Sequence, residues 1–247
     1  MIFTEYAKGL LDVLIPRACL RCGVKLIKKS ALCDNCLSFK RNFPPFCPRC
    51  GQGISAGFKT KTCPRCLRTK FYFDRNLSPF LFESPLTELI HLFKYQGFDN
   101  LGLIFSEKLA LFIRSLNLRL DNYDFITSVP LHPRKLRERE YNQSRILAEN
   151  IGLKFGLQFF QALGVKRYLK SQVTRTYRQR QTELKDNFYL KADVSGKRLV
   201  LVDDVFTTGA TVSESAKVLK ENGASEVLVL TLAIRKPQYQ KSDENNT

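Results

Sequence analysis

The sequence has no tryptophan, one methionine and only two histidines, His91 and His132, neither of which stands in a pattern typical of a general base. No apolar run approaches the roughly 20 residues that a membrane-spanning helix needs. The first residues, MIFTEYAKGLLDVLIP, carry Glu5 before the apolar stretch and no basic leader, which argues against a signal peptide. We therefore expect a cytoplasmic protein without membrane insertion.

Acidic residues are also scarce. The 247 residues include 40 Lys/Arg and 23 Asp/Glu, a net charge of +17, and residues 1–75 hold 15 of the cations against four acids. Clustered cations favour a polyanionic partner such as nucleic acid or a nucleotide, because binding releases counterions from the phosphates. The alternative interpretation is a solvated basic surface.

No cysteine lies after residue 66. All eight fall in Cys-x-x-Cys pairs, which are Cys19/Cys22, Cys33/Cys36, Cys47/Cys50 and Cys63/Cys66. Disulfides would suit a secreted chain, and redox-active dithiols rarely come four at once. Two such pairs can instead complete the tetrahedral shell of one Zn²⁺ ion. The pattern predicts two zinc sites, and closed sites of four cysteines leave no coordination position open, so both should be structural.

The residue after each pair indicates which pairs share a metal. Gly23, Leu37, Gly51 and Leu67 follow the four pairs in order, which suggests one ribbon repeated twice. Glycine after a pair permits the positive φ that turns backbone amides towards the sulfurs. We therefore pair the first with the second and the third with the fourth, with a cross-braced arrangement as the alternative.

Residues 1–75 are predicted to form an N-terminal helix, over the apolar positions between Ile2 and Leu14, and a double zinc-ribbon module. Its cations are interleaved with aromatic residues, a composition that suits single-stranded DNA because bases stack and phosphates pair. Alternatively the aromatics pack over the zinc sites, the more frequent role for any one of them. They are Phe39, Phe43, Phe46, Phe58, Phe71 and Tyr72.

Residues 76–235 alternate between strand and helix patterns, followed by a polar tail, 236–247. Ser84 is the predicted N-cap of the first helix. Alternation of this kind predicts an α/β domain with a mainly parallel sheet and helices on both faces. The expected strands are 76–83, 124–129, 197–203 and 226–233, and the expected helices are 85–95, 101–117, 142–155 and 211–222.

The most informative stretch is RLVLVDDVFTTGATV, residues 198–212. A buried strand ends near Asp203 and Asp204, two carboxylates that suit the vicinal hydroxyls of a ribose, and open α/β sheets bind ligands at this end of their strands. Small and hydroxylic residues then open a helix and can surround a phosphate. The segment resembles the 5-phosphoribosyl diphosphate (PRPP) signature of type I phosphoribosyltransferases. The predicted PRPP-binding residues are Val202, Asp203, Asp204, Thr207, Thr208, Gly209, Ala210 and Thr211, with the two aspartates as the catalytic candidates.

Almost the whole chain resembles the ComF family, in which a cysteine-rich zinc module precedes a phosphoribosyltransferase domain. The resemblance includes LLDVLIPRACLRCG, LIHLFKYQG at 89–97 and VPLHPRKLREREYNQSRILA at 129–148. It implies PRPP binding with Mg²⁺ and a role in natural competence, with single-stranded DNA as a partner. By position it implies pyrophosphate contacts from Lys94, Pro130, Leu131, Arg137 and Arg139. A solvated basic face is the alternative for the arginines.

Two departures from the family pattern concern turnover. Glu140 stands where the family usually has glycine, and would be strained if that position needs a positive φ. In the segment 166–186, which has seven Lys/Arg and is a candidate lid, Gln172 and Arg180 fit the family spacing. Glu183 and Asn187 replace its usual asparagine and alanine.

Three hypotheses remain. The protein is a DNA-uptake factor with a PRPP site, an active phosphoribosyltransferase on an unknown acceptor, or a scaffold that recruits a helicase and carries a vestigial PRPP site. Fold alone does not decide between them.

Overall fold

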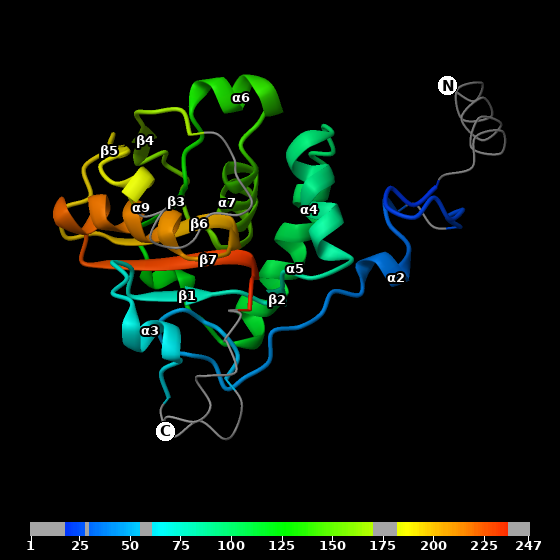
Figure 1. Ribbon diagram of the computed structural model, residues 1–247, viewed down its shortest axis with the longest axis horizontal. Coiled ribbons are helices and arrows are strands. Elements are labelled where there is room, and N and C mark those ends of the chain that lie inside the picture. The colour runs from blue at the N-terminus through cyan, green and yellow to red at the C-terminus, as the bar shows by residue number, and fades with distance from the viewer. Residues whose placement is uncertain (1–17, 28–29, 55–60, 170–181, 237–247) are drawn as a thin grey trace.

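The structure, a computed structural model, describes residues 18–27, 30–54, 61–169 and 182–236. Its centre is a parallel sheet in the order β1 (Arg75–Leu77), β7 (Glu226–Ile234), β6 (Arg198–Phe206) and β3 (Phe125–Ser128), with β2 (Phe80–Leu81) also paired to β7. An antiparallel pair, β4 (Leu163–Val165) and β5 (Phe188–Leu190), stands apart from it. The parallel sheet expected from the alternating pattern is confirmed (Figure 1).

Both faces of the sheet are covered. Successive side chains of a strand point to opposite faces, so one strand contributes to the core on each side. Along β6, Val200 and Val202 belong to the core that includes α4 (Leu86–Tyr95), α5 (Leu101–Ser115) and α7 (Gln143–Phe155). Leu199 and Leu201 belong to the core that includes α9 (Ala210–Glu221). All four β6 side chains are fully buried, as expected for a strand between two layers.

Several element boundaries differ from the prediction. The single strand expected over 76–83 is wrong: it divides into β1 and β2 around Pro79, which has no N–H to donate to a sheet. Ser84 is not a helix cap, since α4 begins after Pro85 and the Ser84 hydroxyl accepts a hydrogen bond from Arg21 instead. β6 continues to Phe206, three residues beyond its expected end.

Short helices escaped the sequence analysis. They are α2 (Asp34–Leu37), α3 (Pro64–Arg68), α6 (Pro133–Arg139) and a 3-10 turn at Leu120–Asn122. Proline at the first helical position was an available signal for both α3 and α6.

The two ribbons are attached differently. The second ribbon, residues 46–68, lies against β1: Asn76 donates to Cys50 O at 2.8 Å, and its own N–H donates to Arg49 O at 2.7 Å. Figure 1 shows α2 of the first ribbon beyond α4, far from α3 of the second beside β1. Contacts of the second ribbon therefore cross the predicted boundary between residues 1–75 and residues 76–235. The division of the chain at this boundary stays a prediction.

Some expectations fall outside the described residues. They are the helix in the first 17 residues, Phe58, the tail from 237, and the middle of the candidate lid with Gln172 and Arg180. Among the residues that are described, none belongs to a helix with the length and hydropathy required to span a membrane.

Candidate functional site

The four cysteine pairs repeat two local structures. After Cys19 and after Cys47 the chain turns back, with Gly23 N–H donating to Cys19 O at 2.9 Å and Gly51 N–H to Cys47 O at 3.0 Å. Both glycines have positive φ, +73° and +70°, as the sequence predicted. The second pair of each ribbon begins a short helix, with Cys33 and Cys63 as the N-caps of α2 and α3. The structure is one ribbon repeated twice.

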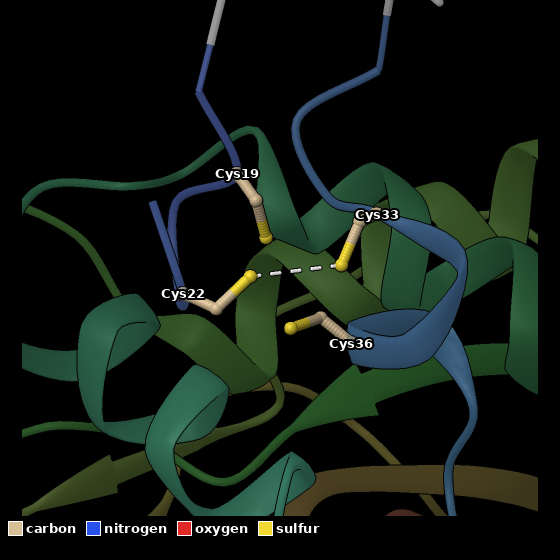
Figure 2. Close-up of side chains that lie close together, drawn as sticks. All are labelled: Cys19, Cys22, Cys33 and Cys36. Carbon is tan, nitrogen blue, oxygen red and sulfur yellow. Dashed lines mark hydrogen bonds between the residues drawn. The ribbon is translucent and has the colours of Figure 1, made fainter. Parts of the chain in front are cut away.

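The sulfur atoms gather in two groups of four, Cys19/Cys22/Cys33/Cys36 and Cys47/Cys50/Cys63/Cys66. Within each group all sulfurs lie within 4.8 Å of one another, and Figure 2 shows the first four pointing towards a common centre. Tetrahedral Zn²⁺ with bonds of about 2.3 Å places its sulfurs about 3.8 Å apart. The Cys22–Cys33 and Cys50–Cys63 sulfurs are 3.7 and 3.5 Å apart. Both groups therefore fit structural zinc, with the predicted pairing and not the cross-braced one.

The two clusters differ in exposure. In the first, Cys22 is exposed and Cys33 partly exposed, whereas all four cysteines of the second are buried. The second cluster belongs to the same hydrophobic core as α9 and one face of β6. Cys19 and Cys36 of the first cluster are nevertheless buried in the core that includes α4, α5 and α7. Each cluster therefore supports one of the two cores, and the first is the more exposed to solvent.

The aromatic residues of the ribbons take mostly structural roles. Phe39 and Phe71 are buried, and Phe46 contacts Phe112 edge to face at 6.1 Å. Phe43 alone of the described set is highly exposed, at 64%. The ring contacts of these residues run to phenylalanines outside the ribbons, so packing over the zinc sites stays an interpretation.

The C-terminal half of β6 carries the two aspartates. Asp203 Oδ1 accepts hydrogen bonds from the Ser144 hydroxyl at 2.8 Å and from Asp204 N at 2.9 Å. Ser144 lies in the first turn of α7, which Asn142 caps by accepting from the Ser144 and Arg145 amides. Because Asn142 also donates to Val129 O at 3.0 Å, the start of α7 is fixed to the loop after β3. Ser144 was not singled out from the sequence.

The protonation of Asp203 follows from its surroundings. Removal of water and the nearby Asp204 charge raise its pKa to about 7, although the Ser144 hydrogen bond and the Lys94 charge act in the opposite direction. Near neutral pH this carboxyl group is therefore poised between its two protonation states.

Asp204 has a different partner. Its Oδ2 lies 2.5 Å from Lys94 Nζ, and both side chains are largely buried. Lys94 is in the last turn of α4, where Phe93 O accepts from the Tyr141 hydroxyl at 2.6 Å and from Gln143 Nε2 at 3.2 Å. The end of α4 and the start of α7 thus hold Lys94 against the aspartate pair.

The loop after β6 turns at Gly209, which has φ +81° and is the N-cap of α9. A Cβ there would lie 2.4 Å from the Phe206 ring and 2.8 Å from the Phe71 ring, so the loop closes tightly on two aromatics. The Thr208 hydroxyl accepts from Ala210 N at 3.3 Å. The first turn of a helix leaves backbone N–H groups without intrahelical acceptors, a suitable environment for a phosphate.

A cavity of about 200 Å³ brings many of these residues together. The loop after β3 forms one wall, and His132 in it is the N-cap of α6, its Nδ1 accepting from Arg134 N at 3.1 Å. Predicted site residues that line the cavity are Lys94, Pro130, Leu131, Arg139, Asp203, Asp204 and Thr211. Predicted site residues outside its lining are Arg137, Val202, Thr207, Thr208, Gly209 and Ala210.

The arginines of α6 separate in the structure. Arg139 contacts the Tyr95 hydroxyl at 2.9 Å and lies over the Tyr95 ring at 4.7 Å. Arg137 is exposed on α6. Glu140, which follows the last residue of α6, has φ +67°, the left-handed conformation for which glycine is suited. The substitution noted in the sequence thus falls on a strained position.

The described ends of the candidate lid meet at Asn187. Its side chain accepts from Arg167 N at 2.8 Å, its carbonyl accepts from Lys166 N at 2.8 Å, and it is buried. Arg167 and Asn187 both line the cavity. In the sequence, Asn187 is distinguished only by its departure from the family pattern.

Comparison with known proteins agrees with this architecture. The model of a double zinc ribbon domain matches residues 10–68, and that of a phosphoribosyl transferase domain matches residues 143–247. The DNA utilization protein YhgH of Escherichia coli (strain K12) is 32% identical over 224 residues, which is 88% of this chain and 97% of that protein. Competence protein F of Haemophilus influenzae is 29% identical, covering 87% and 96%, and competence protein ComFC of Streptococcus pneumoniae is 27% identical, covering 82% and 87%.

Two solved structures show the extent of similarity, each over little more than half of this chain. The allosteric regulatory enzyme of purine biosynthesis is 23% identical with a TM-score of 0.34, over 54% of this chain and 24% of that one. A hypoxanthine-guanine phosphoribosyltransferase of Bacillus anthracis is 15% identical with a TM-score of 0.37, over 58% and 73%.

These features define a phosphoribosyltransferase-type protein with a double zinc ribbon before its sheet domain. Relatives named YhgH, competence protein F and ComFC match over most of their length. The chain belongs to the ComF family.

Proposed function

We propose that the protein binds PRPP in the cavity at the end of β6 and acts in the use of incoming single-stranded DNA. The observation that carries the proposal is the arrangement of Asp203 and Asp204 at the cavity wall, directly before a phosphate-type loop and opposite Lys94. The two carboxylates, the Lys94 ammonium group and Thr211 of the first turn of α9 line this one small volume.

The binding mode follows from the chemistry of each wall. The ribose hydroxyls donate to the two aspartates, and the 5-phosphate binds at the start of α9, where helix amides and the helix dipole favour an anion. The pyrophosphate lies towards Lys94, Arg139 and the loop after β3. His132 lines the same wall, and its Nδ1 accepts the hydrogen bond that fixes the ring at the start of α6.

Ligand entry involves an exchange of partners. In the ligand-free protein Lys94 already neutralises Asp204. A bound pyrophosphate offers Lys94 a stronger anion, and a ribose hydroxyl can then take its place on the carboxylate. The cavity of about 200 Å³ is below the usual range of ligand pockets, so release of Lys94 also makes room.

The residues present also fit Mg²⁺ bound with the ligand. Mg²⁺ prefers oxygen donors and is commonly held by one or two carboxylates together with substrate phosphates. Asp203 and Asp204 offer carboxylate oxygens beside the expected pyrophosphate position. The ion would neutralise charge on the pyrophosphate, while the loop and Lys94 orient the rest of the ligand.

Calorimetry of the zinc-loaded protein with PRPP, in the presence and absence of Mg²⁺, tests the proposal. Ribose 5-phosphate should bind more weakly than PRPP, since it lacks the pyrophosphate contacts. Replacement of both aspartates by asparagine should abolish binding of PRPP. If neither ligand gives a heat of binding with the wild-type protein, and neither raises its melting temperature, the PRPP site is vestigial.

The DNA role is supported by the net charge of +17 and by the names of the relatives, a DNA utilization protein and two competence proteins. Fluorescence anisotropy with a labelled oligo-dT strand tests it. Affinity should fall steeply as salt rises, because phosphate contacts release counterions. No binding at low salt would exclude direct handling of single-stranded DNA.

Phosphoribosyl transfer is a second candidate activity. A larger cavity of about 630 Å³ adjoins the first, and Pro130, Leu131, Asn142 and Val165 line both. It offers room for an acceptor beside the sugar. Release of pyrophosphate from PRPP in the presence of bases or amines would support transfer, and a protein that binds PRPP without ever consuming it would be a binding module only.

A further inference from the structure

Arg65 connects the second zinc cluster to the phosphate loop. It precedes the cluster residue Cys66 in α3, and its guanidinium donates from Nη1 to Thr207 O and from Nη2 to Arg235 O, both at 3.3 Å. The same group lies over the Phe206 ring, 5.7 Å from its centre. One side chain of the ribbon thus holds the last residue of β6, the loop after it, and the end of β7.

The contact to Thr207 has a consequence for the next amide. In a trans peptide the carbonyl oxygen and the following N–H point in opposite directions. Because Arg65 draws Thr207 O towards the ribbon, the N–H of Thr208 points away from the ribbon, and we place the 5-phosphate on that side of the loop. Successive N–H groups oriented in this way form an anion-binding concavity.

The other contacts of this interface hold the same loop. Phe71, just after the ribbon, packs edge to face on Phe206 at 5.9 Å and closes on Gly209. The N–H of Tyr72 donates to the Ser213 hydroxyl in the first turn of α9 at 3.2 Å. Loop and helix start are therefore braced by residues 65–72, which are themselves held by the four buried cysteines.

We propose that Arg65 is a positioning residue for the phosphate loop and that the second zinc cluster sets the affinity of this loop for a phosphate monoester. The inference rests on the proposed PRPP site, because it assigns the 5-phosphate to that loop. Arg65 acts through the Thr207 peptide and does not touch the ligand.

The test compares Arg65→Gln and Arg65→Lys with the wild type and with Lys70→Gln, which removes one exposed positive charge nearby. Three probes are titrated by calorimetry: ribose 5-phosphate, PRPP with Mg²⁺, and inorganic pyrophosphate. Arg65→Gln should weaken ribose 5-phosphate and PRPP about tenfold, the effect of losing one hydrogen bond to a charged group. Pyrophosphate binding should stay within about twofold, since it uses the other wall of the cavity.

Arg65→Lys keeps the charge but cannot donate to both carbonyls, so its affinity for ribose 5-phosphate should fall between those of Arg65→Gln and the wild type. Zinc content and melting temperature are measured for each variant. Equal loss for all three probes, or an equal loss in Lys70→Gln, would overturn the proposal. If the wild type binds neither sugar phosphate, the proposed function itself fails; if it binds both and the Arg65 variants match it, only the present inference fails.

Discussion

Lys94 Nζ and Asp204 Oδ2 lie 2.5 Å apart, so the acidic end of β6 is neutralised from within the protein. The neighbouring Asp203 is instead hydrogen-bonded by Ser144 and has a raised pKa of about 7. The two adjacent aspartates therefore have different electrostatic partners, one a cation and one a hydroxyl. A ligand that brings both a diol and an anion can satisfy all of these groups at once.

Lys94→Met should separate the contributions of sugar and pyrophosphate. It removes the cation expected on the pyrophosphate, so PRPP should bind about tenfold or more weakly. The affinity for ribose 5-phosphate should fall much less. This ligand has no pyrophosphate to bind Lys94, and in the variant its hydroxyls no longer compete with Lys94 for Asp204. Calorimetry with PRPP and with ribose 5-phosphate measures the change in affinity for each ligand, and the two changes are then compared.

The control for this variant is Lys108→Met. Lys108 is a partly exposed lysine of α5 that lines a separate cavity beside the first ribbon. It should leave both affinities unchanged. An equal loss of ribose 5-phosphate and PRPP in Lys94→Met would contradict the exchange of partners.

Much of the fold could be predicted because the features concerned depend only on residues close together in the sequence. The strand before Asp203, the small residues at 207–211 and the four cysteine pairs each determine their own structure within a few residues. The ribbon repeat could be deduced from Gly23 and Gly51, since a turn of positive φ requires a particular residue.

Relations between distant segments could not be predicted. Arg65 and Thr207 are separated by 142 residues, and no periodicity connects them. Likewise Ser144 reaches Asp203 only because α7 packs on β6, and nothing in its own neighbourhood marked it. The candidate site is thus predicted where one loop forms it and missed where segments far apart in the sequence meet.

Asp203→Asn should change how stability depends on pH. A carboxyl group whose pKa is raised by folding stabilises the protein fully below its unfolded pKa and loses that contribution as pH rises through about 7. Replacing the carboxyl group by an uncharged amide should therefore stabilise the folded protein more at high pH than at low pH. Relative to wild type, the unfolding free energy of Asp203→Asn should rise by about 1–3 kcal/mol between pH 5 and pH 8.

Urea denaturation at both pH values measures this difference. Asp121→Asn is the matched control: a hydrogen bond from Arg119 lowers the pKa of that exposed carboxyl group, so its removal should give no gain at high pH. A pH-independent difference for Asp203→Asn would show that the carboxyl group ionises in the folded protein as it does in the unfolded chain.

Glu140→Gly should stabilise the protein. Glu140 has φ +67°, and a left-handed conformation costs a residue with a Cβ atom about 1–2 kcal/mol. Part of this gain is offset by the greater freedom of glycine in the unfolded chain, so the net effect should be about 0.5–1 kcal/mol. Glu138→Gly, inside α6, should instead destabilise by about 0.5–1 kcal/mol. Chemical denaturation of both variants tests the opposite signs.

The two zinc clusters should release metal at different rates. Cys22 is exposed, whereas Cys50 is 0% exposed and its cluster lies within the core shared with α9, so a chelator reaches the first cluster sooner. Zinc release to a chromophoric chelator should therefore show a fast and a slow phase of equal size. Cys22→Ser should abolish the fast phase and lower the melting temperature only moderately, because Cys22 is the exposed member of its cluster. Cys50→Ser should lower the melting temperature strongly, because the second cluster supports the core of the domain. A single release phase, or equal loss of stability in the two variants, would contradict the unequal roles of the ribbons.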